Sequence, residues 1–209
     1  RFTGAVSSTA FPWLTLQEMK IAEVPALVLR VSYVGESGFE FHVARADAAR
    51  LFAALEDAGR PFGIGHYGAY AANSMRLEKG YRRWGMDLTT ERTPLETGLS
   101  YLVKTDGRDF IGRDAMLARS PNWDMVLLEI DTDGAVEPFY SHSIMAQGRA
   151  IGVVTSGAFG HRVRKSLALA FLREPSMREG LTVKLLGRER KARILDAPPY
   201  DPQNLRLRA

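Results

Sequence analysis

The sequence contains no cysteine, which excludes disulfides, thiolate zinc sites, cysteine-ligated iron–sulfur clusters and thiol nucleophiles. No apolar run approaches the ~18 residues that a membrane span needs, and the N-terminal stretch lacks the charged-then-apolar order of a secretory signal. The histidines form no i,i+4 pair of the kind that binds a metal ion. With 45% apolar residues for a core, we expect a globular protein of the cytoplasm, with no membrane partner and no metal.

Positive charge is unevenly distributed along the chain. The net charge is only +4, but Lys and Arg clearly outnumber Asp and Glu after residue 160. Two interpretations remain open, a solvated face and a binding patch for polyanions. The basic residues alternate with apolar ones as in strands, without the interleaved aromatics of nucleic-acid platforms. We therefore expect no nucleic-acid partner, and nucleic-acid binding through residues 161–193 is kept as an alternative.

The first half of the sequence predicts helices packed on a hairpin. Residues 26–33 form a β-branched and aliphatic run, and residues 38–43 alternate apolar and polar side chains, so the two predict a hairpin around the turn "GESG". Residues 44–59 have helical apolar spacing with a glycine at the end. Residues 67–81 predict a second helix, whose face of small and apolar residues includes Tyr70.

The second half predicts a separate β domain. Residues 82–104 form a long ordered loop interrupted by Gly and Pro, residues 109–119 a short helix or turn, and "SPNW" at 120–123 a linker. Short strands separated by Gly and Pro follow, which is typical of a small barrel or sandwich; they read "MVLLEID", "AIGVVTSGAF", "SLALAFL", "LTVKLLG" and "RKARIL". The predicted class is α+β, with one domain over residues 1–120 and a second over residues 121–209.

Two glutamates of the hairpin "SYVGESGFEFHV" have different expected roles. Glu36 lies in the turn, where a solvated carboxylate is an ordinary structural residue. Glu40 lies within the strand, on a face that also carries Gly38 and His42, which leaves room for a ligand. Tyr33, on the partner strand, is the candidate for a ring beside that carboxylate. A carboxylate can accept two parallel hydrogen bonds from a planar heterocycle such as a 2-amino-4-oxo pteridine. The alternative is an exposed glutamate without a ligand.

The segment "RLEKGYRRWGMD" adds Trp84 beside a glycine, either as a stacking ring or as a core anchor. Glu96, after a proline, is interpreted as a residue that fixes the loop. The string "GVVTSGAFGH" has glycines like a phosphate loop, but it lacks the lysine and the strand-to-helix context, which favours a barrel hairpin.

Four strings, in this order, resemble the tetrahydrofolate-dependent aminomethyltransferase family, which includes the glycine cleavage T-protein: "SYVGESGFEFHV", "GAYAANSMRLEKGYRRWGMDLTTERTPLETGL", "DFIGRDAML" and "GVVTSG". The similarity is greatest to the C-terminal part of dimethylglycine and sarcosine dehydrogenases. It implies a ferredoxin-like α/β half of a folate-binding domain followed by a small β-barrel. It also implies that Tyr33 and Glu40 line the pocket for tetrahydrofolate, with the glutamate on the pteridine edge.

The resemblance further implies one-carbon transfer from a methylated amine or aminomethyl donor to tetrahydrofolate. The family's catalytic aspartate would lie N-terminal to the motif that begins at Tyr33, so no catalytic residue is assigned and we expect this segment alone not to be catalytically competent. The chain opens on Arg1 and we expect it to be part of a longer polypeptide. FAD would bind only in an upstream domain, because this segment has no dinucleotide fingerprint. The compartment would be the mitochondrial matrix in a eukaryote.

A second class of function is a non-catalytic folate-binding module, as in iron–sulfur assembly relatives with a K-G-C-Y-x-G-Q-E string. The corresponding "KGYRRWGMD" of this chain lacks that cysteine, which favours the transferase interpretation.

Overall fold

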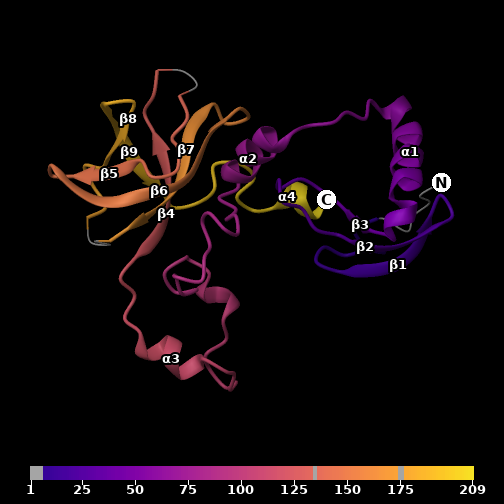
Figure 1. Cartoon of the computed structure of the whole chain (residues 1–209), viewed down its shortest axis with the longest axis horizontal. Coiled ribbons are helices and arrows are strands. Elements are labelled where there is room, and N and C mark those ends of the chain that lie inside the picture. The colour runs from indigo at the N-terminus through magenta and orange to yellow at the C-terminus, as the bar shows by residue number, and fades with distance from the viewer. Residues whose placement is uncertain (1–6, 134–135, 174–176) are drawn as a thin grey trace. The chain divides into compact units, whose positions relative to one another are not determined.

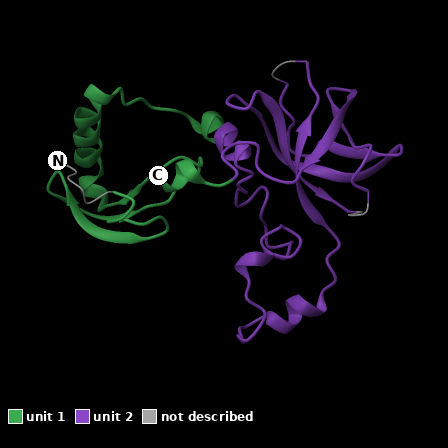
Figure 2. Cartoon of the chain, turned by 180° about the vertical axis from the view of Figure 1, so that it is seen from behind, with its two compact units in different colours: residues 1–72, 203–209 green, residues 73–202 purple. Residues whose placement is uncertain are grey.

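A computed structural model of the chain describes residues 7–133, 136–173 and 177–209. The chain divides into two compact units, the first comprising residues 1–72 and 203–209 and the second residues 73–202 (Figure 2). The predicted boundary between residues 120 and 121 remains a prediction. No helix of the described ranges is both long and apolar enough to cross a membrane.

The first unit is built on an antiparallel sheet in the order β1-β2-β3 (Figure 1). The strands are β1 (Leu16–Ile21), β2 (Val24–Leu29) and β3 (Glu40–His42). The predicted hairpin is confirmed as the β2–β3 pair, but β2 ends at Leu29 and the connection is longer than the "GESG" turn. The sequence interpretation missed β1, which joins β2 through Ala22 and Glu23, both with positive φ.

One face of this sheet forms the core of the first unit. The buried residues include Phe11, Val28 and Leu51, the last from α1 (Ala48–Gly59). Phe39, Phe41 and Val43 pack on the same cluster, as the period-2 alternation predicted. Helix α1 confirms the predicted helix and its end at Gly59. The short helices of this unit are η1 (Arg45–Asp47), η2 (Arg60–Phe62) and α4 (Leu205–Arg208).

Helix α2 (Ala69–Glu78) confirms the second predicted helix, but its buried side was partly mispredicted. Ser74 and Leu77 are buried as expected, whereas Tyr70 is 85% exposed. Arg76 and Glu78 are buried in its place, because each finds polar partners in the second unit. The loop after α2 contains η3 (Ser100–Leu102), and α3 (Arg113–Ala118) follows at the predicted short helix.

The second unit contains a closed antiparallel barrel, with strands in the order β4-β7-β6-β5-β8-β9 (Figure 1). The strands are β4 (Asp124–Ile130), β5 (Ser143–Ala146), β6 (Arg149–Gly160), β7 (Lys165–Leu172), β8 (Thr182–Leu185) and β9 (Arg188–Leu195). All but β5 were predicted. The α+β class with a C-terminal barrel is therefore confirmed.

Apolar side chains fill the barrel and also cover part of its outer surface. The inner cluster includes Leu128, Val154 and Leu172, each fully buried. A second cluster, which includes Leu77 of α2 and Phe171 of β7, lies outside the first. Gly157 has a packing role, since a Cβ at this position would lie 2.2 Å from the carbonyl oxygen of Pro138.

Candidate functional site

The β2–β3 hairpin places Glu40 on the open face of the three-stranded sheet. In the strand register, Leu16 lies opposite Leu29 and Leu29 opposite Glu40, so these three side chains share one face. Leu27 and His42 form the next row on that face. Leu16 is 61% exposed, and Leu27 and Leu29 are half-buried. The carboxylate therefore stands at the end of an apolar strip.

The Glu40 carboxylate is accessible and has a histidine beside it. Its Oε2 lies 3.4 Å from Nε2 of His42, and the two side chains are 56% and 57% exposed. A groove of about 780 Å³ begins at His42 and runs across β1 and β2. Its lining residues are Glu18, Met19, Lys20, Pro25, Ala26, Leu27, His42, Val43, Ala44 and Asp47. Glu40, Leu16 and Leu29 are not among these lining residues; a planar ligand on the open face beside the groove would find three leucine side chains and a carboxylate acceptor.

Tyr33 lies in the connection after β2 and is 42% exposed. A local bond orders this connection, since the backbone N–H of Gly35 donates to Oγ of Ser32 at 3.1 Å. A Cβ at Gly38 would lie 3.1 Å from the carbonyl oxygen of Val31, so the returning chain passes close to the outgoing one. Strand pairing fixes the position of Glu40 but not that of the Tyr33 side chain. That the two residues line one pocket remains a prediction.

Trp84 belongs to the second unit and is 70% exposed, so it is not a core anchor. It lies in a tight turn in which the N–H of Gly85 donates to the carbonyl of Leu88 at 2.8 Å. The N–H groups of Asp87 and Leu88 both donate to the carbonyl of Arg83. The turn presents the indole to solvent on a rigid base.

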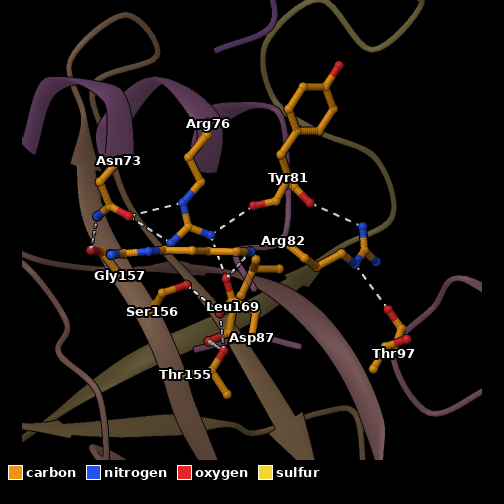
Figure 3. Close-up of polar contacts among 12 residues, drawn as sticks. Asn73, Arg76, Tyr81, Arg82, Asp87, Thr97, Thr155, Ser156, Gly157 and Leu169 are labelled. Atoms are coloured by element: carbon orange, nitrogen blue, oxygen red, sulfur yellow. Dashed lines mark hydrogen bonds and ion pairs between the residues drawn. The ribbon is translucent and has the colours of Figure 1, made fainter. Parts of the chain in front are cut away.

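A buried polar network anchors that turn to α2 and to the barrel (Figure 3). Asp87 and Arg76 are both fully buried, and Arg76 Nη1 lies 2.6 Å from Asp87 Oδ2. The same oxygen accepts the backbone N–H of Arg83 at 2.8 Å. The hydroxyls of Thr155 and Ser156 donate to Asp87 Oδ1, the latter at 2.5 Å. Both oxygens of this carboxylate therefore have two donors each, as burial of a charge requires.

A β-bulge explains why two successive hydroxyls reach one carboxylate. Side chains of a regular strand alternate between faces, but the register of β6 against β7 shifts between Val154 and Ser156. Thr155 is the additional residue, and both it and Ser156 are buried. The sequence interpretation missed this network. The available signal was the polar pair "TS" inside the otherwise apolar run "AIGVVTSGAF".

Arg76 completes its hydrogen bonds within α2 and the segment after it. Its Nη1 donates to the carbonyl of Tyr81 at 2.8 Å, and its Nε and Nη2 donate to Oδ1 of Asn73. Asn73 in turn donates to the carbonyl of Gly157 at 3.0 Å. The neighbouring Arg82 donates to the carbonyl of Thr97, and burial lowers its pKa, against the opposing charges of Tyr101 and Asp87.

Glu96 fixes the long loop, as predicted. Its Oε2 accepts the backbone N–H and the hydroxyl of Thr93, and its Oε1 accepts the N–H of Asn122 at 3.2 Å. Burial alone raises the pKa of this carboxyl, but those hydrogen bonds and the charge of Arg119 outweigh burial, so the pKa lies below its usual value. The Glu96 carbonyl accepts the N–H of Met125, which ties the loop to β4. Over the described residues, no group of three or more His, Asp or Glu side chains can hold a metal ion.

Comparison with known proteins gives two family-model matches. The GCVT N-terminal domain model matches residues 1–107, and the glycine cleavage T-protein C-terminal barrel domain model matches residues 124–201. The chain belongs to the glycine cleavage T-protein family. The hairpin with Tyr33 and Glu40 and the Trp84 turn fall within the first match, and the barrel strands fall within the second.

Several members of this family are similar over nearly the whole chain. Human mitochondrial dimethylglycine dehydrogenase is 36% identical over 199 residues, which cover 92% of this chain and 23% of that protein. An aminomethyltransferase of Symbiobacterium thermophilum is 34% identical over 205 residues, covering 95% of this chain and 54% of that protein. Mouse mitochondrial sarcosine dehydrogenase is 31% identical over 214 residues, covering 97% and 23%.

A solved structure gives the same result. The glycine cleavage system aminomethyltransferase T of Bartonella henselae superposes with a TM-score of 0.75 at 26% identity, over 85% of this chain and 50% of that one. The chain thus spans about half the length of the aminomethyltransferases it matches, and about a quarter of the length of the dehydrogenases.

Proposed function

We propose that this chain is the tetrahydrofolate-binding portion of a one-carbon transferase or of a methylamine-demethylating enzyme. The observation that carries the proposal is the position of Glu40, an accessible carboxylate at the end of an apolar strip formed by Leu16, Leu27 and Leu29. Family membership supports the reaction class, since the similar proteins are named aminomethyltransferase, dimethylglycine dehydrogenase and sarcosine dehydrogenase.

The chemistry of the donor set fits a pterin. Its 2-amino group and adjacent ring N–H are two parallel donors on one edge, and a carboxylate accepts both in a bidentate, charge-assisted arrangement. The ring faces are apolar enough to cover leucine side chains. Tetrahydrofolate supplies the amine nitrogen that accepts the one-carbon unit. Glu40 would hold the pterin ring by the edge that carries the 2-amino group, away from the accepting nitrogen. Orientation of this kind lowers the barrier to one-carbon transfer.

Tyr33 and Trp84 are the proposed stacking residues for folate. Each is exposed enough to meet a ligand, Tyr33 in the first unit and Trp84 in the second. The proposed donor is a small methylated amine or an aminomethyl group, and an upstream flavin domain of the same polypeptide would supply the oxidation in a dehydrogenase. The proposed compartment is the cytoplasm, or the mitochondrial matrix in a eukaryote.

Calorimetric titration of tetrahydrofolate into the whole chain tests the proposal. Each charge-assisted hydrogen bond contributes ~1.5–3 kcal/mol, so Glu40→Gln, which replaces one acceptor oxygen by an amide donor, should weaken binding about 10- to 100-fold. Glu23→Gln is the matched control, because Glu23 is exposed in the β1–β2 turn of the same unit.

Two results would contradict the proposal. Equal affinity of the Glu40→Gln and Glu23→Gln variants would remove Glu40 from the site. Absence of heat and of any fluorescence change with tetrahydrofolate, in a chain whose circular dichroism shows it to be folded, would remove folate binding from this segment.

A further inference from the structure

A second groove, of about 650 Å³, lies entirely in the second unit, on the barrel where β4 ends and β7 begins. Its lining comes from residues 129–132 of β4 and the loop after it, from Phe159 of β6, from Arg164 of the β6–β7 turn, from residues 165–166 of β7, and from residues 191–193 of β9. The folate proposal uses none of these residues.

The groove carries an excess of positive charge. Four cations line it, Arg164, Lys165, Lys191 and Arg193, against the two carboxylates of Glu129 and Asp131. Oε2 of Glu129 accepts both Lys165 Nζ, at 2.6 Å, and Arg193 Nη2, at 2.7 Å. A single carboxylate therefore serves two cations, and the groove, with four positive and two negative side chains, keeps a net charge of +2.

The other two cations have no assigned role in the fold. Among the described residues, neither the Arg164 side chain nor the Lys191 side chain has a hydrogen-bond or ion-pair partner, and both residues are exposed. They lie on either side of the end of β4, because Arg164 immediately precedes β7, Lys191 lies in β9, and β4 pairs with β7 on one side and with β9 on the other. Two inter-strand spacings of ~4.8 Å place these strands about 10 Å apart.

We propose that this groove binds an oligocarboxylate, a ligand with at least two carboxylates spaced along an aliphatic chain. Arg164 and Lys191 receive carboxylates on the two sides of the end of β4, and the half-buried side chains of Ala192 and Phe159 contact the chain between them. Glu129 and Asp131 repel dense negative charge in the middle of the groove, so carboxylates spaced along a chain fit it better than a compact dianion such as phosphate.

Nucleic acid fits this groove less well. Backbone-tracking sites interleave cations with exposed aromatic rings for base stacking. Phe159 is the one aromatic side chain that lines the described groove. Its ring already packs edge-on against the ring of His161, with 5.2 Å between the ring centroids. The oligocarboxylate has two conceivable sources, a free acid or a glutamate tail carried by the folate. The second source rests on the proposed function, and the first does not.

The test uses a triglutamate peptide, titrated calorimetrically into the whole chain at low ionic strength, with triglutamine as the uncharged control. The double variant Arg164→Gln/Lys191→Gln should weaken triglutamate binding about fivefold or more, because each exposed charge pair contributes modestly. Lys184→Gln/Arg188→Gln is the matched control, since it removes one exposed Lys and one exposed Arg of β8 and β9 that lie outside the groove. Added salt to ~0.15 M should weaken wild-type binding.

A second arm separates the two sources by comparing tetrahydrofolate with one and with three glutamates. An advantage of the longer tail that disappears in the Arg164→Gln/Lys191→Gln variant assigns the groove to the folate tail. Triglutamate binding without a tail advantage assigns it to a separate acid, and it supports the groove even if folate itself does not bind.

Three results would overturn the inference. They are triglutamate affinity that is equal in the groove variant and in the matched control, triglutamine binding as tight as triglutamate, and no triglutamate binding at low ionic strength. A single-stranded oligonucleotide that binds more tightly than triglutamate and depends on Arg164 and Lys191 would assign the groove to nucleic acid instead.

Discussion

The buried pair of Arg76 and Asp87 allows a quantitative prediction about stability. Asp87→Asn keeps the shape of the side chain but leaves the fully buried Arg76 guanidinium without its carboxylate. Removal of one partner from a buried ion pair costs about 3–5 kcal/mol. Arg76 retains its bonds to Asn73 and to the carbonyl of Tyr81, and the amide oxygen introduced by the substitution can still accept two donors, so we expect the lower end, about 3 kcal/mol.

Urea unfolding followed by circular dichroism and tryptophan fluorescence measures this cost. With an m-value of about 2 kcal/mol per molar, a loss of about 3 kcal/mol lowers the midpoint of the second unit by about 1.5 M. The control is Asp133→Asn, which breaks the exposed pair with Arg190 and should cost less than about 1 kcal/mol. Equal midpoints for the two variants would refute the reasoning.

The double variant Arg76→Met/Asp87→Asn separates the ion pair from the rest of the network. Because the orphaned charge is then absent, the double variant should be less destabilised than the sum of the single variants, with a coupling of about 2 kcal/mol. Additive losses would show that the hydroxyls of Thr155 and Ser156, rather than the charge pair, account for the stabilisation.

Three further predictions concern stability. Folding lowers the pKa of Glu96 below its usual value of 4.5, so the carboxylate's contribution to stability is present above pH 4.5 and is lost as the pH falls below that value. In a plot of urea midpoint against pH, Glu96→Gln should flatten the acidic part of the curve. Gly157→Ala should destabilise the barrel by about 1–3 kcal/mol through the clash with Pro138, whereas Gly65→Ala, with no atom within 4 Å of the new Cβ, should change the thermal midpoint little. Arg30→Met should cost about 2 kcal/mol in the first unit, because the buried guanidinium donates to the backbone oxygens of Phe11 and Ala209. A proteolysis time course should then show earlier cleavage around residues 203–209.

Local patterns predicted much of the fold. The alternation of Phe39, Phe41 and Val43 with Glu40 and His42 set the two faces of β3 correctly, because the side-chain period of a strand is 2. The barrel strands are short apolar runs between glycines and prolines. Strand β5 was missed because four residues carry too little periodicity to stand out.

The polar pair "TS" marks one part of the buried network, but its pairing with Asp87 could not be predicted because the partners are far apart in the sequence. Asp87 meets Ser156, 69 residues later, only through the bulge in β6, and no local pattern marks a register shift. The same contacts decided which side of α2 is buried. Arg76 has the charge of a surface residue, yet it is fully buried because Asp87 and Asn73 pair its donors.

The two sheets differ in whether they have edge strands. The barrel closes on itself, so each of its strands has neighbours on both sides. In the described part of the chain, β1 pairs only with β2, which leaves the backbone amides and carbonyls along its other side open to strand addition. Self-association of the isolated chain by backbone pairing should therefore start at residues 16–21, and a proline within that strand should suppress it while leaving the barrel intact.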